Sequence, residues 1–171
     1  MRIEYRFRND RGDAQRISYH VFPGIEIIYN SIHTDYCYLS RNNREDFIEI
    51  HHCREGRMEQ HREGAFFYLM PGDLSLSQKK QHPCAYSFPL RHYHGLTIFI
   101  DTSTAPRCFS CFLEDVDIRP IEISRRLCGR QDCFVLRSLD CIDHIFSGVY
   151  PLFERNVYPG KTRVQQRDVQ E

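Results

Sequence analysis

The sequence predicts a mainly β fold, a small antiparallel barrel or sandwich with two helices near its C-terminal end. Three glycine-containing turns between short segments rich in β-branched and aromatic residues support this prediction: Glu55-Gly56, Glu63-Gly64 and Pro71-Gly72-Asp73. Proline fixes φ for a turn and glycine supplies a positive φ, so each turn has a physical cause. Strands of roughly five residues between tight turns form antiparallel hairpins, and several in succession favour a barrel or a sandwich.

Length and charge limit the class of protein. The chain has 171 residues, enough for one domain with a sizeable core, and its 41% hydrophobic content is ordinary for a globular protein. Because 23 basic residues are balanced by 23 acidic ones, the net charge gives no indication that the chain binds nucleic acid. The charged N-terminal stretch lacks the apolar core of a signal peptide, and no apolar run approaches the roughly 18 residues of a membrane helix. We therefore expect a cytoplasmic protein without a membrane segment.

Apolar residues that alternate with a period of two identify the strands. Residues 1–16 are polar, and we expect a peripheral strand or a loose segment there. Residues 34–46 are also polar and are expected to form a loop. The predicted strands are Ile25–Asn30, Phe47–Cys53, Phe66–Leu69, Leu74–Ser77 and Arg91–Ile100.

The same alternation assigns side chains to faces of the sheet. In the strand of residues 47–53, Glu49 and His51 are expected on the face opposite to His52. In the strand of residues 91–100, one face is expected to carry His92, His94, Leu96, Ile98 and Ile100. If that face points into the barrel, the two histidines are partly buried groups that need hydrogen-bond partners, a bound ligand or a metal ion.

The C-terminal third changes pattern. A short helix is expected from Pro120 to a stop at Cys128-Gly129, then a short strand at Phe134–Leu136. Ser138 is expected to cap a second helix, before Pro151 discourages its continuation. The apolar stripe of that helix is Ile142, Ile145, Phe146 and Val149, at the spacing of one helix face. The last eleven residues are almost wholly polar, and we expect them to be frayed.

The order of these elements resembles the cupin-like N-terminal domain of AraC-type transcription regulators. The similarity covers about Pro23 to Phe153 and rests on the two E-G turns, FYLMPGDL, HYHGLTIFID and the later FLEDVDI. It implies a cupin-like double-stranded β-helix (jelly-roll barrel) followed by two short C-terminal α-helices. The expected division is an N-terminal peripheral segment (1–22), the barrel (23–101), a helical part (102–155) and a polar tail (156–171).

The resemblance also implies a function. The barrel is expected to bind a small-molecule effector, a sugar or related metabolite, and the helices to mediate dimerisation, so that the protein is a homodimer. DNA binding is expected only through a helix-turn-helix domain, which none of these residues match; we therefore expect a truncated regulator or a shortened chain. Two alternatives stay open: a stand-alone cupin enzyme, such as an isomerase or dioxygenase, and a truncated regulator that acts through mixed dimers. We predict no catalytic residues, since no nucleophile or nucleotide-binding motif is present.

Polar side chains near the three glycine-containing turns are the candidates for effector binding. These candidates are Glu49, His51, Tyr68, His82, His92 and His94. Glu49 and His82 stand where the resemblance places two of the four cupin metal ligands, but the H-x-H pair would fall on Asn42, Asn43 and Arg44. An open metal site usually has three protein ligands, so no metal is expected there and no cofactor is required.

Cysteines offer a separate metal candidate. The chain has eight, and in a protein without a signal peptide, thiols or a metal site are favoured over a disulfide framework. The C-x2-C pair Cys108 and Cys111 is followed, after sixteen residues, by the wider pair Cys128 and Cys133. Two such pairs flanking a compact element can hold a tetrahedral structural zinc ion. The alternative is that the thiols pack as small hydrophobic groups.

Overall fold

The computed structural model describes residues 2–38, 47–62, 64–79, 85–109, 119–128, 133–137, 139–154 and 162–166. The described part is mainly β with two helices, as predicted. In chain order its elements are β1 (Arg2–Asn9), β2 (Gly12–Phe22), β3 (Ile25–His33), β4 (Tyr36–Tyr38), β5 (Phe47–Gly56), β6 (Met58–Arg62), β7 (Ala65–Leu69), β8 (Leu74–Lys79), β9 (Ala85–Ser87), β10 (Tyr93–Asp101), α1 (Pro120–Cys128), β11 (Cys133–Leu136), α2 (Asp140–Glu154) and β12 (Thr162–Gln166).

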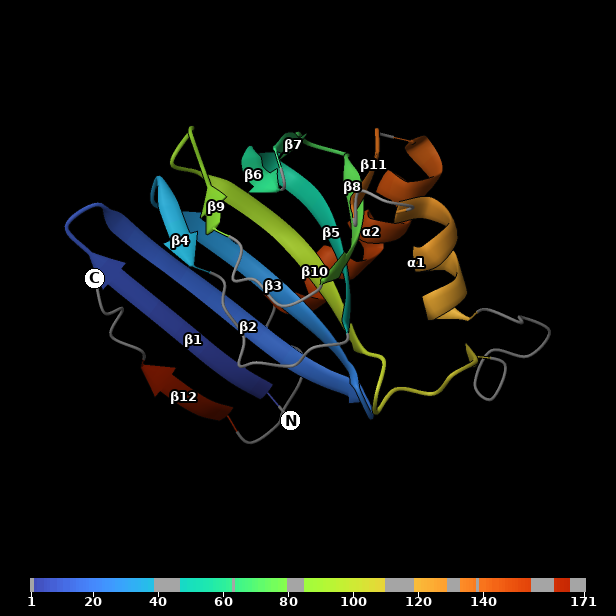
Figure 1. The fold of residues 1–171 in the computed structure, drawn as a ribbon. Helices are drawn as coiled ribbons and strands as arrows, with labels where there is room; N and C mark the ends of the chain where they lie inside the picture. Colours follow the sequence, from blue (N-terminus) through green and yellow to red (C-terminus); the bar gives the residue numbers. More distant parts are fainter. Residues whose placement is uncertain are drawn as a thin grey trace.

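The strands form two sheets (Figure 1). The large sheet has eight strands in the order β11-β8-β5-β10-β3-β2-β1-β12, and the small sheet has four in the order β4-β9-β6-β7. Neighbouring strands are antiparallel except β1 and β12, which pair in parallel. Strand β10 lies between β3 and β5, so the centre of the large sheet is assembled from segments that are distant in the sequence.

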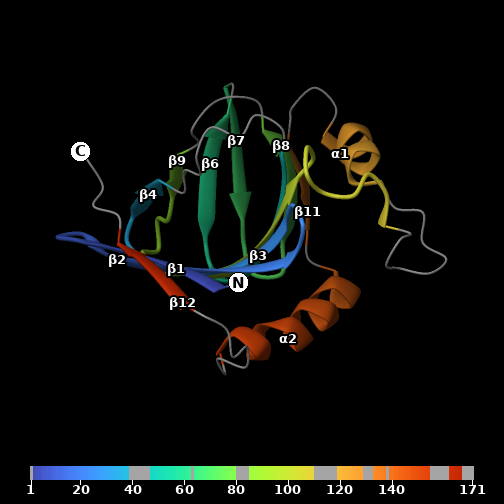
Figure 2. The same cartoon turned by 90° about the horizontal axis from the view of Figure 1, so that it is seen from below.

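The small sheet and helix α2 lie on opposite faces of the large sheet (Figure 2). We call the face toward the small sheet the inner face and the face toward α2 the outer face. The apolar core on the inner side includes Met58 and Leu69 of the small sheet and Ile32 and Tyr93 of the large one. Because both faces are covered, the central strand β10 is buried on both: Leu96 and Phe99, which point to opposite sides, are each 1% exposed.

The helices cover the outer face in different ways. Tyr150 and Phe153 of α2 pack against Ile17, Tyr19 and Leu96 of the sheet. The predicted apolar stripe of α2 is only partly buried: Phe146 and Val149 join this contact, whereas Ile145 is 64% exposed. Helix α1 buries small side chains, Pro120, Ser124 and Cys128, which recur every fourth residue on one face.

Three local expectations are corrected by the structure, and a strand, one of the two alternatives for residues 1–16, is found there. Residues 1–16 contain β1 and the start of β2, and Tyr36–Tyr38 of the expected loop form β4. The frayed tail contains β12, which is held by its pairing with β1. Helix α2 continues through Pro151 to Glu154. Ser138, the expected cap, lies outside the described residues.

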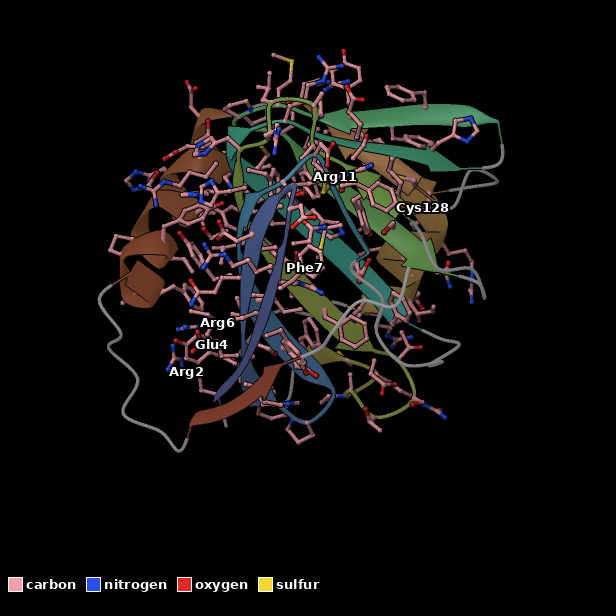
Figure 3. All side chains as sticks on the ribbon, turned by 90° about the vertical axis from the view of Figure 1, so that its left-hand side faces the viewer. Arg2, Glu4, Arg6, Phe7, Arg11 and Cys128 are labelled. Carbon is pink, nitrogen blue, oxygen red and sulfur yellow. The ribbon has the colours of Figure 1, made fainter. Side chains whose placement is uncertain are left out.

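A row of charged side chains runs along β1 (Figure 3). Glu4 accepts hydrogen bonds from Arg2 at 3.3 Å, from Arg6 at 2.5 Å and from Gln15 of β2 at 2.7 Å. Its side chain is only 5% exposed. Burial raises the pKa of Glu4, but the bonds from Gln15 and Arg6 and the two guanidinium charges outweigh it, so the pKa is lowered overall.

No helix in the described part of the chain is long and apolar enough to cross a membrane.

Candidate functional site

A chain of polar side chains crosses the inner face of the large sheet over four adjacent strands. Arg16 of β2 donates to Asn30 of β3 at 2.9 Å, and the Asn30 amide donates to the Thr97 hydroxyl of β10 at 2.9 Å. Thr97 Oγ1 lies 2.9 Å from Nδ1 of His51 on β5. Asn30, Thr97 and His51 are at most 4% exposed, so these hydrogen bonds run through the protein interior.

The small sheet completes this polar chain. Nε2 of His51 lies 3.4 Å from Oε2 of Glu49, which is two residues away on the same face of β5. Tyr86, on β9 of the small sheet, donates its hydroxyl to the same carboxylate oxygen at 3.3 Å. When the Thr97 hydroxyl donates to Nδ1 of His51, the ring proton is on Nε2, where it faces Glu49. We call Arg16, Asn30, Glu49, His51, Tyr86 and Thr97 the interior polar chain.

Three buried polar atoms in or beside this chain make no hydrogen bond. They are Nε2 of His51, Nε2 of Gln60 and Oγ of Ser77. For His51 this means that the 3.4 Å contact with Glu49 lacks hydrogen-bond geometry. Ser77 lies opposite Glu49 in the β5–β8 ladder, and Gln60 lies opposite Tyr86 in the β6–β9 ladder. Leaving a buried donor or acceptor unpaired costs about 1–3 kcal/mol. Native interiors pair most such groups, so three in one interior region make that region a candidate site for a polar ligand.

Apolar side chains bound the interior polar chain at both ends. Toward one end of the strands, Ile28, Phe47 and Phe99 form a cluster, with the two phenyl rings 4.8 Å apart. Toward the other end, Phe88 and Tyr93 are fully buried, with their rings 5.3 Å apart. A polar strip between aromatic walls is the usual composition of a small-molecule site, where few polar groups fix orientation and apolar surface supplies contact area.

The predicted ligand-binding residues separate into three places. Glu49 and His51 lie together in the interior, whereas Tyr68 lies on β7 under two guanidinium groups, those of Arg57 at 4.7 Å and Arg137 at 4.2 Å. His92 and His94 share a face with Leu96, as expected, but this is the outer face, which α2 covers further along. His82 lies outside the described residues.

Sequence reasoning missed six residues of the interior: Arg16, Asn30, Gln60, Ser77, Tyr86 and Thr97. The signal was present for two of them. Asn30 interrupts the apolar alternation of β3, and Thr97 is a polar residue between Gly95 and Phe99 on the inward face of β10. Neither is informative until the register brings the two strands side by side.

The four cysteines of the predicted zinc site are not assembled by the described part of the chain. Cys111 lies outside it. Cys108, Cys128 and Cys133 do not form a group of three mutually close ligands, and the Cys128 thiol donates to the carbonyl of Leu76 at 3.3 Å. Cys128 is 5% exposed and belongs to the core between α1 and the sheet, which is the role of a small packed hydrophobic group. Zinc bound by all four thiols stays a prediction.

Comparison with known proteins identifies the fold. No family model and no curated protein sequence matches the chain. Among solved structures, the AraC-like transcriptional activator CuxR is similar with a TM-score of 0.51 and 13% sequence identity, over 84% of this chain and 46% of CuxR. A cupin 2 barrel protein from Salinispora arenicola also matches, with a TM-score of 0.39 and 15% identity over 56% of this chain and 82% of that one. An HTH_3 family regulator from Vibrio cholerae matches with a TM-score of 0.42 and 20% identity over 60% of this chain and 56% of that one.

These similarities concern architecture alone. The chain spans less than half the length of CuxR, and at 13% identity the correspondence carries no information about individual site residues. Two facing antiparallel sheets followed by two helices confirm the predicted fold class. The chain has a cupin-like jelly-roll fold.

Proposed function

We propose that this chain is the effector-sensing domain of an AraC-type transcription regulator and that it binds a small hydroxyl-rich molecule, such as a sugar, between its two sheets. The observation that carries the proposal is the interior polar chain together with three buried atoms that make no hydrogen bond: Nε2 of His51 within it, and Nε2 of Gln60 and Oγ of Ser77 beside it. The likeness to CuxR supports the regulatory context, because that protein is described as a transcriptional activator and has the same architecture over most of this chain.

The donors and acceptors suit a sugar or polyol. The carboxylate of Glu49 accepts hydrogen bonds from hydroxyl groups, while the ring N–H of His51 and the amide of Gln60 donate to hydroxyl oxygens. The hydroxyl of Ser77 can do either. The phenyl rings of Phe47 and Phe99 offer an apolar surface to the C–H faces of such a ligand. A hydroxyl-rich ligand therefore uses the carboxylate as acceptor and the aromatic end as contact surface.

The sheet offers a direct route from this interior to helix α2. His51 and His52 are adjacent on β5 and point to opposite faces. His51 belongs to the interior polar chain, whereas Nδ1 of His52 lies 3.0 Å from the Tyr150 hydroxyl of α2. A ligand that shifts β5 at His51 therefore also shifts His52, and with it the contact between β5 and Tyr150 of α2. In the proposed function this is how effector binding reaches the helix.

We further propose that α2 mediates a homodimer. Its outward side presents Ile145, which is 64% exposed, and Leu152, which is 40% exposed, while its opposite side packs on the sheet. Burying such side chains against a second copy contributes roughly 1.5–3 kcal/mol each. Sedimentation at micromolar concentration tests this: a dimer should dissociate in Ile145→Asp, and a clean monomer in the unmodified chain contradicts it. Contact with DNA belongs to a helix-turn-helix part, which these residues do not supply.

Calorimetry and thermal unfolding with neutral sugars, polyols and sugar acids test effector binding. The sharpest variant is Ser77→Ala. Removing an unpaired buried hydroxyl should leave the stability of the ligand-free protein unchanged or slightly raised. It should nevertheless lower the affinity for the ligand by about tenfold, because one hydrogen bond to the ligand is lost. His61→Ala, at an exposed position on β6, is the matched control and should bind normally. No binding across the panel contradicts the sensor proposal, and metal-dependent turnover of a bound sugar selects the cupin-enzyme alternative instead.

A further inference from the structure

Three histidines gather on the outer face of the large sheet, on the side opposite to the interior polar chain. His33 is the last residue of β3, His92 immediately precedes β10, and His94 is the second residue of β10. The antiparallel register pairs His94 with Ser31, so two positions further along, His92 lies opposite His33. Side chains two residues apart on a strand share a face, and cross-strand neighbours stand about 5 Å apart. The topology alone therefore brings three imidazoles together.

The three rings are in mutual contact. Their centroids are separated by 5.4 Å (His33–His92), 5.3 Å (His33–His94) and 4.7 Å (His92–His94). Nε2 of His94 lies 3.5 Å from Nε2 of His33. One ring nitrogen from each histidine lies within 4.8 Å of the other two, and in the described part of the chain no other three His, Cys, Asp or Glu side chains meet this condition.

These separations fit a small divalent ion. A zinc–nitrogen bond of about 2.05 Å in a tetrahedral site places neighbouring ligand nitrogens about 3.3 Å apart. The His33–His94 nitrogens already approach this spacing, and His92 needs only a rotation of its half-exposed side chain, which is 43% exposed. All three residues are half-buried, so an ion can enter from solvent and a water molecule can occupy a fourth position.

A carboxylate stands behind the cluster. Oε2 of Glu55, at the end of β5, lies 3.2 Å from Nε2 of His92 and 4.0 Å from Nδ1 of His94. Histidines that bind metal ions usually donate their other ring N–H to a carboxylate, which fixes the tautomer and makes the ligand nitrogen more basic. Glu55 thus occupies the position of such an orienting group, and it leaves Nδ1 of His92 for an ion.

The backbone under the cluster is tightly constrained. The β5–β10 ladder shifts register at His94, and a bulge of this kind re-aims side chains. Gly56 has a φ of 82°, and a Cβ atom there would lie 1.8 Å from the carbonyl oxygen of His92. That close approach of β5 to the chain before β10 holds His92 and Glu55 side by side.

We propose that His33, His92 and His94 bind one divalent transition-metal ion of the zinc type through three imidazole nitrogens, with Glu55 orienting His92. Neutral imidazole is a preferred ligand of zinc, and three protein ligands plus an open position form an accessible rather than a closed site. Such an ion joins β3 to β10 on the α2 side of the sheet.

Titration of the chelator-treated chain with Zn²⁺ tests the site, read by calorimetry and by the imidazole nitrogen resonances. We expect about one ion per chain and a rise in the unfolding temperature. His92→Ala, at a half-exposed position, should weaken binding by more than a hundredfold, and Glu55→Gln should weaken it by about 10–100-fold. His94→Ala should abolish binding, with circular dichroism checking that the variant is folded.

Two controls separate this site from the others. His61→Ala removes an exposed histidine elsewhere and should leave zinc binding unchanged. The triple variant Cys108→Ser, Cys128→Ser, Cys133→Ser removes the predicted thiolate site and should also bind one ion. Absence of stoichiometric binding, binding that persists in His92→Ala, or binding lost only in the cysteine variant overturns the proposal. Sugar binding to the unmodified chain and to Ser77→Ala tests the proposed effector site independently. The effector proposal and the zinc proposal can therefore fail separately.

Discussion

The imidazole of His52 on β5 lies flat against the phenyl ring of Phe146 on α2, with ring centroids 4.0 Å apart and planes 2° from parallel. Both nitrogens of the imidazole are also engaged by α2: Nδ1 lies 3.0 Å from the Tyr150 hydroxyl and Nε2 lies 3.2 Å from Oδ1 of Asp143. One buried side chain of the sheet therefore contacts three residues of the helix. A cavity of about 400 Å³ opens beside this contact.

The seating of α2 should depend on pH. Burial lowers the pKa of His52, although the hydrogen bond and charge of Asp143 and the charge of Asp73 oppose this shift. The unfolded state then binds the proton more readily than the folded state, so stability should fall as pH drops below about 6.5, the ordinary value for histidine. Urea unfolding between pH 8 and pH 5, in the presence of chelator, measures how the free energy of unfolding changes with pH. His52→Gln should flatten the slope in part, since His94 shifts in the same direction; an unchanged slope contradicts the assignment.

Phe146 should be the anchor of α2. Phe146→Ala removes the stacked ring and part of the contact with Tyr150 and Phe153, and we expect a loss of about 1.5–3 kcal/mol, below the cost of truncating a fully buried phenylalanine. The neighbouring Ile145→Ala is the control, because a side chain that is 64% exposed should change the unfolding free energy by less than about 0.5 kcal/mol. Equal effects of the two variants would show that α2 is seated differently. Chemical denaturation at a protein concentration at which sedimentation gives a monomer makes the comparison.

Two glycine substitutions should have opposite signs. Gly56→Ala forces a left-handed residue and a clash with the His92 carbonyl oxygen, so it should destabilise the fold by more than about 1 kcal/mol. Gly148→Ala, within α2, meets no atom within 4 Å and should stabilise by roughly 0.5–1 kcal/mol through helix propensity. Thermal unfolding of the two single variants reads both signs, and a destabilised Gly148→Ala would indicate a contact on that side of α2.

Glu4 should hold the β1–β2 edge in place at neutral pH. Glu4→Ala leaves Arg2, Arg6 and Gln15 without their shared acceptor and should cost about 1–3 kcal/mol. Because the pKa of Glu4 is lowered by its partners, its contribution should be lost as pH falls through that lowered value. Glu59→Ala, whose carboxylate pairs with Arg57 on the small sheet, gives a comparison at a separate ion pair. Acid unfolding that is identical in Glu4→Gln and the unmodified chain would contradict this role.

The sequence predicts six of the strands, β3, β5, β7, β8, β10 and β11, and which of their side chains share a face, but not which face is inward. In β5 the separation of Glu49 and His51 from His52 is correct, because side-chain direction alternates strictly along a strand. For His92 and His94 the shared face is also correct, yet it is the outer one. Helix α2 covers that side, so Leu96 and Phe99 are equally buried on opposite faces of β10 and hydrophobicity cannot distinguish inside from outside.

Elements that depend on distant partners were missed for a related reason. Strand β12 is polar, and only its pairing with β1 makes it a strand. The residues Tyr36–Tyr38 form β4 because Ala85–Ser87 lie beside them. The interior polar chain likewise joins side chains of five strands, and His33 meets His92 only through the β3–β10 register. None of these contacts has a signature within a single short segment.

The position of β10 between β3 and β5 also sets the order in which the protein can fold. Until residues 93–101 are available, β3 and β5 each have an unpaired edge facing the place that β10 will occupy. Pairings between segments so far apart in the chain form slowly, because loop closure must come before the contacts that reward it. During synthesis the first half of the domain therefore exposes two unpaired strand edges, and such edges favour aggregation until β10 covers them.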